Sequence, residues 1–392
     1  MDGYTITSFE DADPAERETA IQRAWTAERP TRTLLSPAEG LNVVTVGALH
    51  DDAIEERLPG RTVDPFSGKD LPNLTSALGL GPKRAVKPDI LTSGGREHVI
   101  PQAGGDKIRL RPSKPGKTFG VGAAQPDVAG TASAEANTGG TSAAAAQVTH
   151  ALHRVHDILW GSEDGPLTDI PVQYHPVILK ALSAHTCEWP ERWEELKNIM
   201  GPSDAKRDKE RKDNVTRFLG YGIPDYYKAV KCAENRVTIL GFGDIDSNNA
   251  DQVLIPLPDS IENELTRKMI TVTLAWFTPI NVRHQAYRKL KLETNFNTSN
   301  LKWLGVERRS ENQPSYYTVG QGTLLNATVH GRKAASLIED GNLNLQVVAR
   351  DQAGEKQATA RYGLAVTIKT GDNLPIYDEI RNKLQVRAVS TT

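Results

Sequence analysis

The sequence predicts an α/β portion over residues 1–235, followed by an antiparallel β-sandwich over residues 236–392. An almost continuously apolar segment, Leu41–Leu49, is typical of a buried parallel strand. A glycine turn and an alanine-rich run then predict a helix over residues 141–159. From about residue 236, short segments alternate between apolar and polar residues, with turn residues between them, which is typical of antiparallel strands.

Composition limits the class of protein before any motif is considered. A chain of 392 residues is long enough for two domains. Its net charge of -2 argues against a nucleic-acid or anionic-membrane partner, and no apolar run reaches the length of a membrane span. Cys187 and Cys232 are too few for a disulfide framework, and the N-terminus lacks a signal-peptide pattern. We therefore expect a cytoplasmic protein.

Helix-capping residues and the alternation of apolar and polar residues predict the first elements of the chain. Pro14–Trp25 is predicted to be a helix, with Asp13 as its N-cap and proline in its first position. His50 and Asp51 follow the apolar strand directly. They are predicted to form a solvated turn and not a catalytic pair, because adjacent residues of an extended chain point to opposite faces. Lys107–Arg111 alternates and is predicted to be an exposed strand.

The segment Asn137–Ala146 is the strongest candidate for a functional site. Its glycines permit a tight turn, and Thr141 is the predicted N-cap of the alanine-rich helix. Ser142 then lies in the first turn, where free backbone N–H groups and the helix dipole favour developing negative charge. A nucleophilic serine needs such a setting. The alternative is an ordinary capped helix.

Further helices are expected between this helix and residue 235. Pro176–His185 is predicted to be a buried helix and Glu188–Leu196 a short one. The mixed-sign charge run Asp204–Asp213 is predicted to be a solvated loop. Three histidines recur on the serine helix, but their spacing drifts around the helix, so ordinary surface positions are predicted for them; they are His150, His153 and His156.

Six strands are predicted for the sandwich: Arg236–Leu240, Gln252–Pro256, Met269–Trp276, Gly322–Val329, Leu343–Ala349 and Tyr362–Ile368. Asp244, Asp246 and Asn248 suggest a structural calcium loop. The glycine and the distal glutamate of the EF-hand pattern are absent, so a hairpin turn is predicted here. We expect no metal and no cofactor.

Four segments, in the same order, resemble conserved blocks of one known family. Gly140-Thr-Ser-Ala143 resembles the nucleophile motif of the subtilisin-like serine peptidases (subtilases, peptidase family S8). Leu41–Leu49 resembles the family strand that ends in Val-Gly-Ala, and Val86–Gly94 resembles its Lys-Pro-Asp-Ile block. Phe218–Asp225 is similar to the family's Gly-Tyr-Gly turn. The resemblance spans residues 34–233 and implies an incomplete subtilisin-like parallel sheet with helices on both faces.

The chain also departs from the family pattern. The family's aspartate block, its His-Gly-Thr block and its oxyanion Ala-Gly-Asn turn are absent, and Ala145 and Ala146 lie where a proline is usual. We therefore expect the chain to be the second half of such a peptidase, with a true start upstream of Met1.

The resemblance implies a serine endopeptidase in which Ser142 attacks the peptide bond and the backbone of Gly140, Thr141 and Ser142 supports the oxyanion. Gly120, Gly122 and Gly139 are implied to line the substrate cleft. The implied partners are a protein or peptide substrate and the upstream half of the same domain, without which the chain is expected to be inactive. Two alternatives remain: a non-catalytic protease-like binding or regulatory module, and a truncated gene.

Overall fold

The computed structural model describes residues 1–392 except 2, 55–59, 69, 114–118, 163–164, 262–264, 296–307, 333–340, 355–356, 372–373 and 390–392. The chain forms two compact units. The first unit comprises residues 1–151 and 188–223, and the second comprises residues 152–187 and 224–392. The sequence places a single boundary near residue 235, whereas in the structure the segment 152–187 belongs to the second unit.

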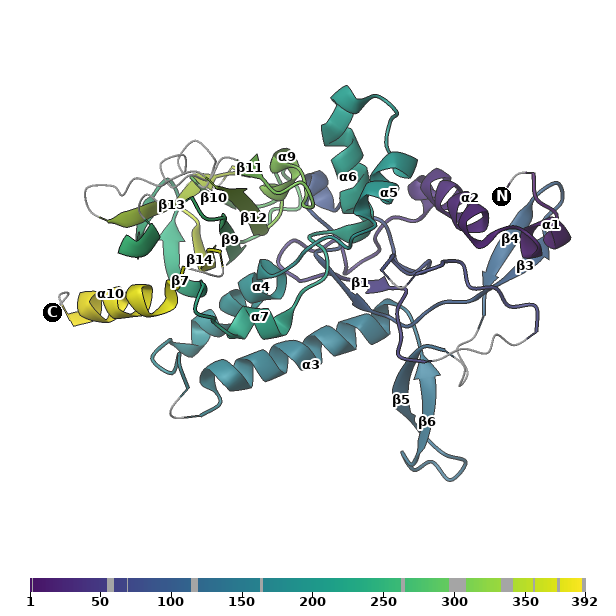
Figure 1. Cartoon of the computed structure of the whole chain (residues 1–392), viewed down its shortest axis with the longest axis horizontal. Helices are drawn as coiled ribbons and strands as arrows, with labels where there is room; N and C mark the ends of the chain where they lie inside the picture. Colours follow the sequence, from purple (N-terminus) through teal and green to yellow (C-terminus); the bar gives the residue numbers. More distant parts are fainter. Residues whose placement is uncertain are drawn as a thin grey trace. The chain divides into compact units, whose positions relative to one another are not determined.

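The first unit combines short helices with three two-stranded sheets (Figure 1). Only one of these sheets is parallel, and it pairs β1 with β2. The hairpins β3–β4 and β5–β6 are antiparallel. The elements are α1 (Ile6–Glu10), α2 (Pro14–Ala27), β1 (Val46–Leu49), β2 (Ile90–Ser93), β3 (Val99–Ala103), β4 (Ile108–Pro112), β5 (Val121–Gln125), β6 (Ala134–Thr138), α5 (Trp193–Met200) and α6 (Asp208–Leu219).

Local sequence explains where these elements begin. Helix α2 starts as predicted, because the carboxylate of Asp13 accepts a hydrogen bond from the N–H of Ala15 and proline occupies the first turn. The predicted strand at Leu41–Leu49 is shorter than expected, since only Val46–Leu49 pairs with β2. The expectation of a loop at Asp204–Asp213 was wrong. Most of the charge run belongs to α6, which buries Val215, Phe218 and Leu219 on one side.

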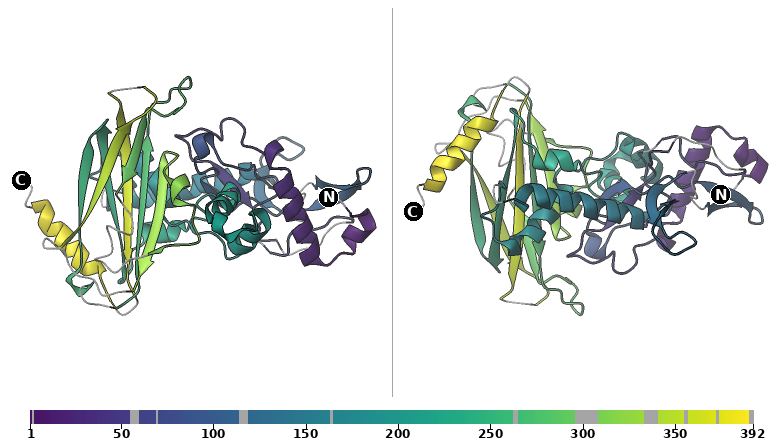
Figure 2. Two further views of the ribbon diagram at one scale, coloured as in Figure 1. Left: turned by 90° about the horizontal axis from the view of Figure 1, so that it is seen from above. Right: turned by 90° about the horizontal axis from the view of Figure 1, so that it is seen from below.

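The second unit contains two antiparallel sheets with one shared apolar core (Figure 2). The five-stranded sheet has the order β11-β12-β9-β14-β7, and the three-stranded sheet has the order β10-β13-β8. All six predicted sandwich segments form strands. The elements are β7 (Arg236–Asp246), β8 (Ala250–Pro256), β9 (Lys268–Phe277), β10 (Leu290–Thr294), β11 (Arg308–Arg309), α9 (Tyr316–Val319), β12 (Leu324–Gly331), β13 (Asn342–Asp351), β14 (Thr359–Lys369) and α10 (Tyr377–Val389).

Helix α4 (His175–His185) packs on the five-stranded sheet against β9 and β14. Gly363 on β14 makes this approach possible, because a side-chain carbon there would lie 2.9 Å from the backbone of Val177. Helix α7 (Tyr226–Val230) also belongs to this unit. The chain as described is therefore a mixed α and β protein, and among its described strands only β1 and β2 pair in parallel.

Candidate functional site

Ser142 lies in the first turn of α3 (Thr141–Trp160), which is the predicted position. Its side chain is exposed, whereas Ala143 and Ala144 are buried beneath it. The helix begins at Thr141 itself, so the prediction that Thr141 is the N-cap was wrong. Gly140 precedes the helix with a φ of +93°, a conformation that glycine adopts without strain.

The turn before Ser142 is fixed to the carboxyl ends of the parallel strands. The N–H of Gly140 donates to the carbonyl of Gly94 over 2.7 Å, and the N–H of Gly94 donates to the carbonyl of Leu49 over 3.0 Å. The side chain of Gln147 on α3 donates to the carbonyl of Ser93 over 2.7 Å. Carboxyl ends of parallel strands are the usual location of ligand sites in α/β proteins. Ser142 is therefore held at the edge where such a site is expected.

The other segments that resemble the peptidase family pack around the same strand pair. Lys87 and Asp89 form a buried ion pair of 2.5 Å. The Lys87 ammonium also donates to the carbonyl of Val43, and Asp89 accepts the N–H of Thr45. The N–H of Tyr221 donates to the carbonyl of Asp89 over 2.8 Å. These contacts join segments 41–49, 86–94 and 218–225 to one another. The hydrogen bond from Gly140 to the Gly94 carbonyl joins them to segment 140–143.

The glycines proposed for a substrate cleft occupy two kinds of position. Gly120 is buried, and its N–H donates to the carboxylate of Asp52 over 2.8 Å. Gly122 on β5 is exposed and lies opposite Asn137 of β6, and Gly139 is exposed just before the helix. The β5–β6 hairpin thus leads directly into the Ser142 turn. A cleft lined by these glycines stays a prediction.

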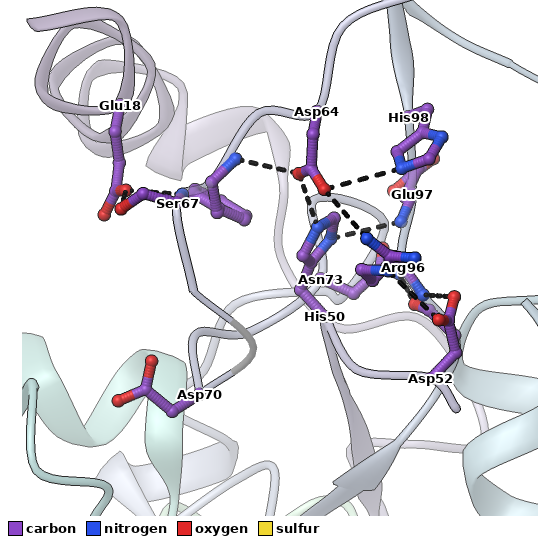
Figure 3. Close-up of polar contacts among 12 residues, drawn as sticks. Glu18, His50, Asp52, Asp64, Ser67, Asp70, Asn73, Arg96, Glu97 and His98 are labelled. Carbon is purple, nitrogen blue, oxygen red and sulfur yellow. Dashed lines mark hydrogen bonds and ion pairs between the residues drawn. The ribbon is translucent and has the colours of Figure 1, made fainter. Parts of the chain in front are cut away.

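A largely buried polar cluster lies near the ends of β1 and β2, and we name it the His50 cluster (Figure 3). It consists of His50, Asp52, Asp64, Arg96 and His98. The Nε2 atom of His50 donates to Asp64 over 2.8 Å, while its Nδ1 atom accepts the N–H of residue 97 over 3.1 Å. Arg96 pairs with Asp52 over 3.0 Å. The expectation of a solvated turn at His50 was wrong, because its side chain is fully buried.

The two carboxylates of the His50 cluster have pKa values below their usual range. Burial acts to raise the pKa of Asp64, but hydrogen bonds from His50 and His98 outweigh it and hold this pKa well below its usual range. The low pKa of Asp52 has a similar origin: burial opposes ionisation, and hydrogen bonds from the N–H groups of Gly120 and Arg96 overcome it. The sequence signal that could have revealed this cluster is the set of polar residues directly after the ends of β1 and β2.

No histidine of the first unit is placed to activate Ser142. Both ring nitrogens of His50 are engaged, and the side chains of His50 and His98 are fully buried. His150 lies two turns further along α3, which is about 12 Å along the helix axis. The side chain of Asn73 is also bonded within the first unit. It is buried, its amide donates to the carbonyl of Gly95, and its oxygen accepts two bonds from Thr75.

The three side chains considered for a calcium loop bind protein groups. Asp244 pairs with Arg361 over 3.0 Å, Asp246 accepts the hydroxyl of Thr359, and Asn248 donates to Asp351. Their turn joins β7 in one sheet to β8 in the other, so the predicted hairpin was wrong. Within the described ranges, no three His, Cys, Asp or Glu side chains are arranged to hold a metal ion. No helix in the same ranges is long and apolar enough to cross a membrane.

Comparison with known proteins leaves the family open. No family model matches the sequence. An uncharacterized protein, y4bN of Sinorhizobium fredii (strain NBRC 101917 / NGR234), is 25% identical over 253 residues, which is 64% of this chain and 52% of that protein. The chain thus spans about half the length of the curated relative that it matches. A solved structure titled "Cyanophage Pam1 capsid asymmetric unit" is 16% identical over 36% of this chain and 89% of that chain, with a TM-score of 0.21, which is too low to establish a shared fold.

Proposed function

We propose that this chain carries the nucleophile-bearing part of a subtilisin-like serine endopeptidase and that Ser142 is the nucleophile. The observation that supports the proposal most is the hydrogen-bonded path from Leu49 through Gly94 to Gly140, which holds an exposed serine at the carboxyl edge of β1 and β2. The segments in contact here are the ones that resemble the peptidase family. Three features thus coincide: an exposed serine, a helix N-terminus and a strand edge.

In this proposal, Ser142 attacks the scissile carbonyl and forms an acyl-enzyme. The first N–H groups of a helix have no acceptor within the helix, so those at Thr141 and Ser142 are suited to stabilise the oxyanion. The exposed β5–β6 hairpin next to the turn offers strand edges to an extended peptide. A histidine polarised by an aspartate must take the serine proton, and we propose that a segment outside residues 1–392 supplies both, together with an oxyanion asparagine.

Labelling by a fluorophosphonate probe tests the proposal. The chain alone should react weakly, because an unassisted serine hydroxyl is a poor nucleophile at neutral pH. Fused to the segment encoded upstream of Met1, it should label strongly and cleave an unfolded protein substrate. Ser142→Ala should abolish both signals. Thr149→Ala is the matched control, since Thr149 is an exposed hydroxyl residue on the same helix whose side chain bonds only the carbonyl of Ala145 in the described structure.

Two results would count against the peptidase. Labelling of the fusion that persists in Ser142→Ala would assign the reactive group elsewhere. An upstream sequence that encodes no aspartate, histidine or asparagine block would favour a protease-like binding module, in which Ser142 is an ordinary first-turn serine.

A further inference from the structure

Strand β7 ends the five-stranded sheet of the second unit on one side. It pairs with β14 along all eleven of its residues, and no described strand pairs with its other edge. In an antiparallel ladder every second residue directs its N–H and C=O groups to the same side, so half of the β7 residues direct them away from β14. Only Val237 and Ile245 of this strand are buried. Helix α10 is anchored before the strand begins, where the N–H groups of Ile376 and Tyr377 donate to the carbonyl of Glu234.

The other described terminal strands of this unit differ from β7. Strand β11 has two residues and β10 has five, while β8 has seven and ends in Pro256. Proteins usually protect a sheet edge with a short strand, a lysine, a proline or a bulge, because an open edge pairs readily with another chain. Strand β7 contains neither lysine nor proline, and its register with β14 has no bulge. Its edge is therefore long, regular and unprotected.

The sequence of β7 is complementary to itself in the antiparallel direction. With Gly241 at the centre, two copies of the strand would pair along their whole length. The face away from the sheet-to-sheet core would then carry an ion pair, a hydrogen-bonding pair and an apolar pair at each end: Arg236–Asp246, Thr238–Asp244 and Leu240–Phe242. On the core face, the branched apolar side chains of Val237 and Ile245 would lie opposite each other.

Other antiparallel registers are less complementary. Moving the centre to Leu240 places Asp246 opposite Glu234, and like charges directly opposite each other are destabilising. Moving the centre to Phe242 places the carboxylate of Asp244 opposite the apolar Leu240. A centre between two residues would oppose groups that point to the free edge with groups that point to β14. The register centred on residue 241 is therefore favoured.

We propose that β7 pairs antiparallel with β7 of a second copy of this chain and forms a two-fold symmetric dimer. Each copy uses the same edge, so assembly stops at two copies. Contacts within the chain hold both ends of the strand in place: the Arg236 guanidinium donates to the carbonyls of Lys228 and Lys231, and Asp246 accepts the hydroxyl of Thr359. A guanidinium has five N–H groups, so Arg236 can bind a carboxylate of the second copy as well.

Sedimentation equilibrium of the full chain and of charge variants tests the dimer. The chain should form dimers with a dissociation constant in roughly the micromolar range. Arg236→Glu and Asp246→Lys each place like charges at both ends of the strand pair and should weaken dimerisation at least about tenfold. An equimolar mixture of the two variants should restore it, because in the mixed dimer Arg236 meets Asp246 and the introduced glutamate meets the introduced lysine. Circular dichroism of each variant checks that it is folded.

Disulfide cross-linking tests the register. A side-chain carbon at Gly241 would lie 3.7 Å from the side chain of Leu364, which is an ordinary contact, so a cysteine fits there. With Cys187 and Cys232 replaced by serine, Gly241→Cys should form an intermolecular disulfide under a mild oxidant. Leu254→Cys, at a position 49% exposed on β8, is the matched control and should not.

Three results would overturn the proposal. One is a chain that stays monomeric at millimolar concentration or grows beyond dimers. Another is a mixture of Arg236→Glu and Asp246→Lys that dimerises no better than either variant alone. The third is cross-linking at position 254 that is as fast as at position 241.

Discussion

The two units stabilise their interiors in different ways. In the first unit, much of the buried material near the strand ends is charged or polar: the Lys87–Asp89 pair, the Arg96–Asp52 pair and the imidazole of His50. Its parallel sheet has only two short strands. In the second unit, strands of up to eleven residues enclose an apolar core, and Trp276 in this core has no exposed surface.

The difference follows from how the backbone hydrogen-bonding groups are satisfied in each interior. Long antiparallel ladders satisfy their own backbone groups, so apolar side chains can fill the space between the sheets. Irregular segments such as residues 60–68, 70–75 and 93–97 lack such ladders. Buried side chains bond their backbone instead: Asp52 accepts the N–H groups of Arg96 and Gly120, and Asn73 donates to the carbonyl of Gly95. The first unit should therefore be sensitive to loss of single charges, and the second to loss of volume.

The largest effect is expected for Lys87→Met. The variant leaves the carboxylate of Asp89 buried without its ammonium partner, which typically costs about 3–5 kcal/mol of unfolding free energy. Urea unfolding measures the loss, and hydrogen exchange should locate it in residues 1–151. The control is Lys83→Met, at an exposed position, which should change stability by less than about 0.5 kcal/mol. Equal effects of the two variants would remove the distinction between buried and surface charge in this unit.

In the second unit, Leu274→Ala should cost about 2–5 kcal/mol, because the fully buried side chain leaves a cavity between the sheets. Leu254→Ala on β8, whose side chain belongs to a residue 49% exposed, is the matched control and should cost much less. In Leu274→Ala, hydrogen exchange should become faster in residues 236–369 and stay unchanged in β1 and β2. Faster exchange in both units would show that they unfold together, which would contradict separate stabilisation of the two units.

A smaller loss of stability is expected for a substitution in the closely packed turn after β2. Gly95→Ala places a methyl group 2.7 Å from the Cα of Gly120 at a φ of +79°. Gly105→Ala has nearly the same φ, +81°, but meets no atom within 4 Å. The control should lose about 1 kcal/mol from backbone strain alone, and Gly95→Ala should lose more, up to about 3 kcal/mol. The difference between the two variants in thermal melting measures how much of the lost stability is due to contact with Gly120.

The dependence of stability on pH should have opposite signs in the two units. Burial raises the pKa of Glu97 from 4.5 to about 7, so the folded state holds a proton that the unfolded state has released between these values. Stability from this group therefore falls as pH rises from about 4.5 to 7. Burial, and then the charge of Arg236, lowers the pKa of His185 from 6.5 to about 3, so its contribution falls as pH drops from 6.5 towards 3.

Glu97→Gln should remove the loss of stability that occurs between pH 4.5 and 7, and His185→Gln should flatten the acid side of the curve. The measurement is urea unfolding at a series of pH values, with hydrogen exchange to assign each change to its unit. A slope of the same sign for both groups would contradict the burial that the structure gives them.

Local sequence determined the elements that depend on neighbouring residues. The cap at Asp13, the helix that carries Ser142 and the six alternating strands of the second unit all formed where their patterns predicted. These patterns have a direct physical cause, because helix periodicity, strand alternation and capping are each set within a few residues.

Only the tertiary structure determined which distant residues those elements contact. The segment Asp204–Asp213 has a polar composition, yet α6 forms there because its later residues reach an apolar core. His50 is paired with Asp64 and not with its neighbour Asp51, and no spacing in the sequence reveals that a loop brings the two together. The same holds for Trp25 and Glu97, which are 72 residues apart and line one cavity. Contacts between distant segments depend on packing of the whole unit, and a local pattern carries no record of them.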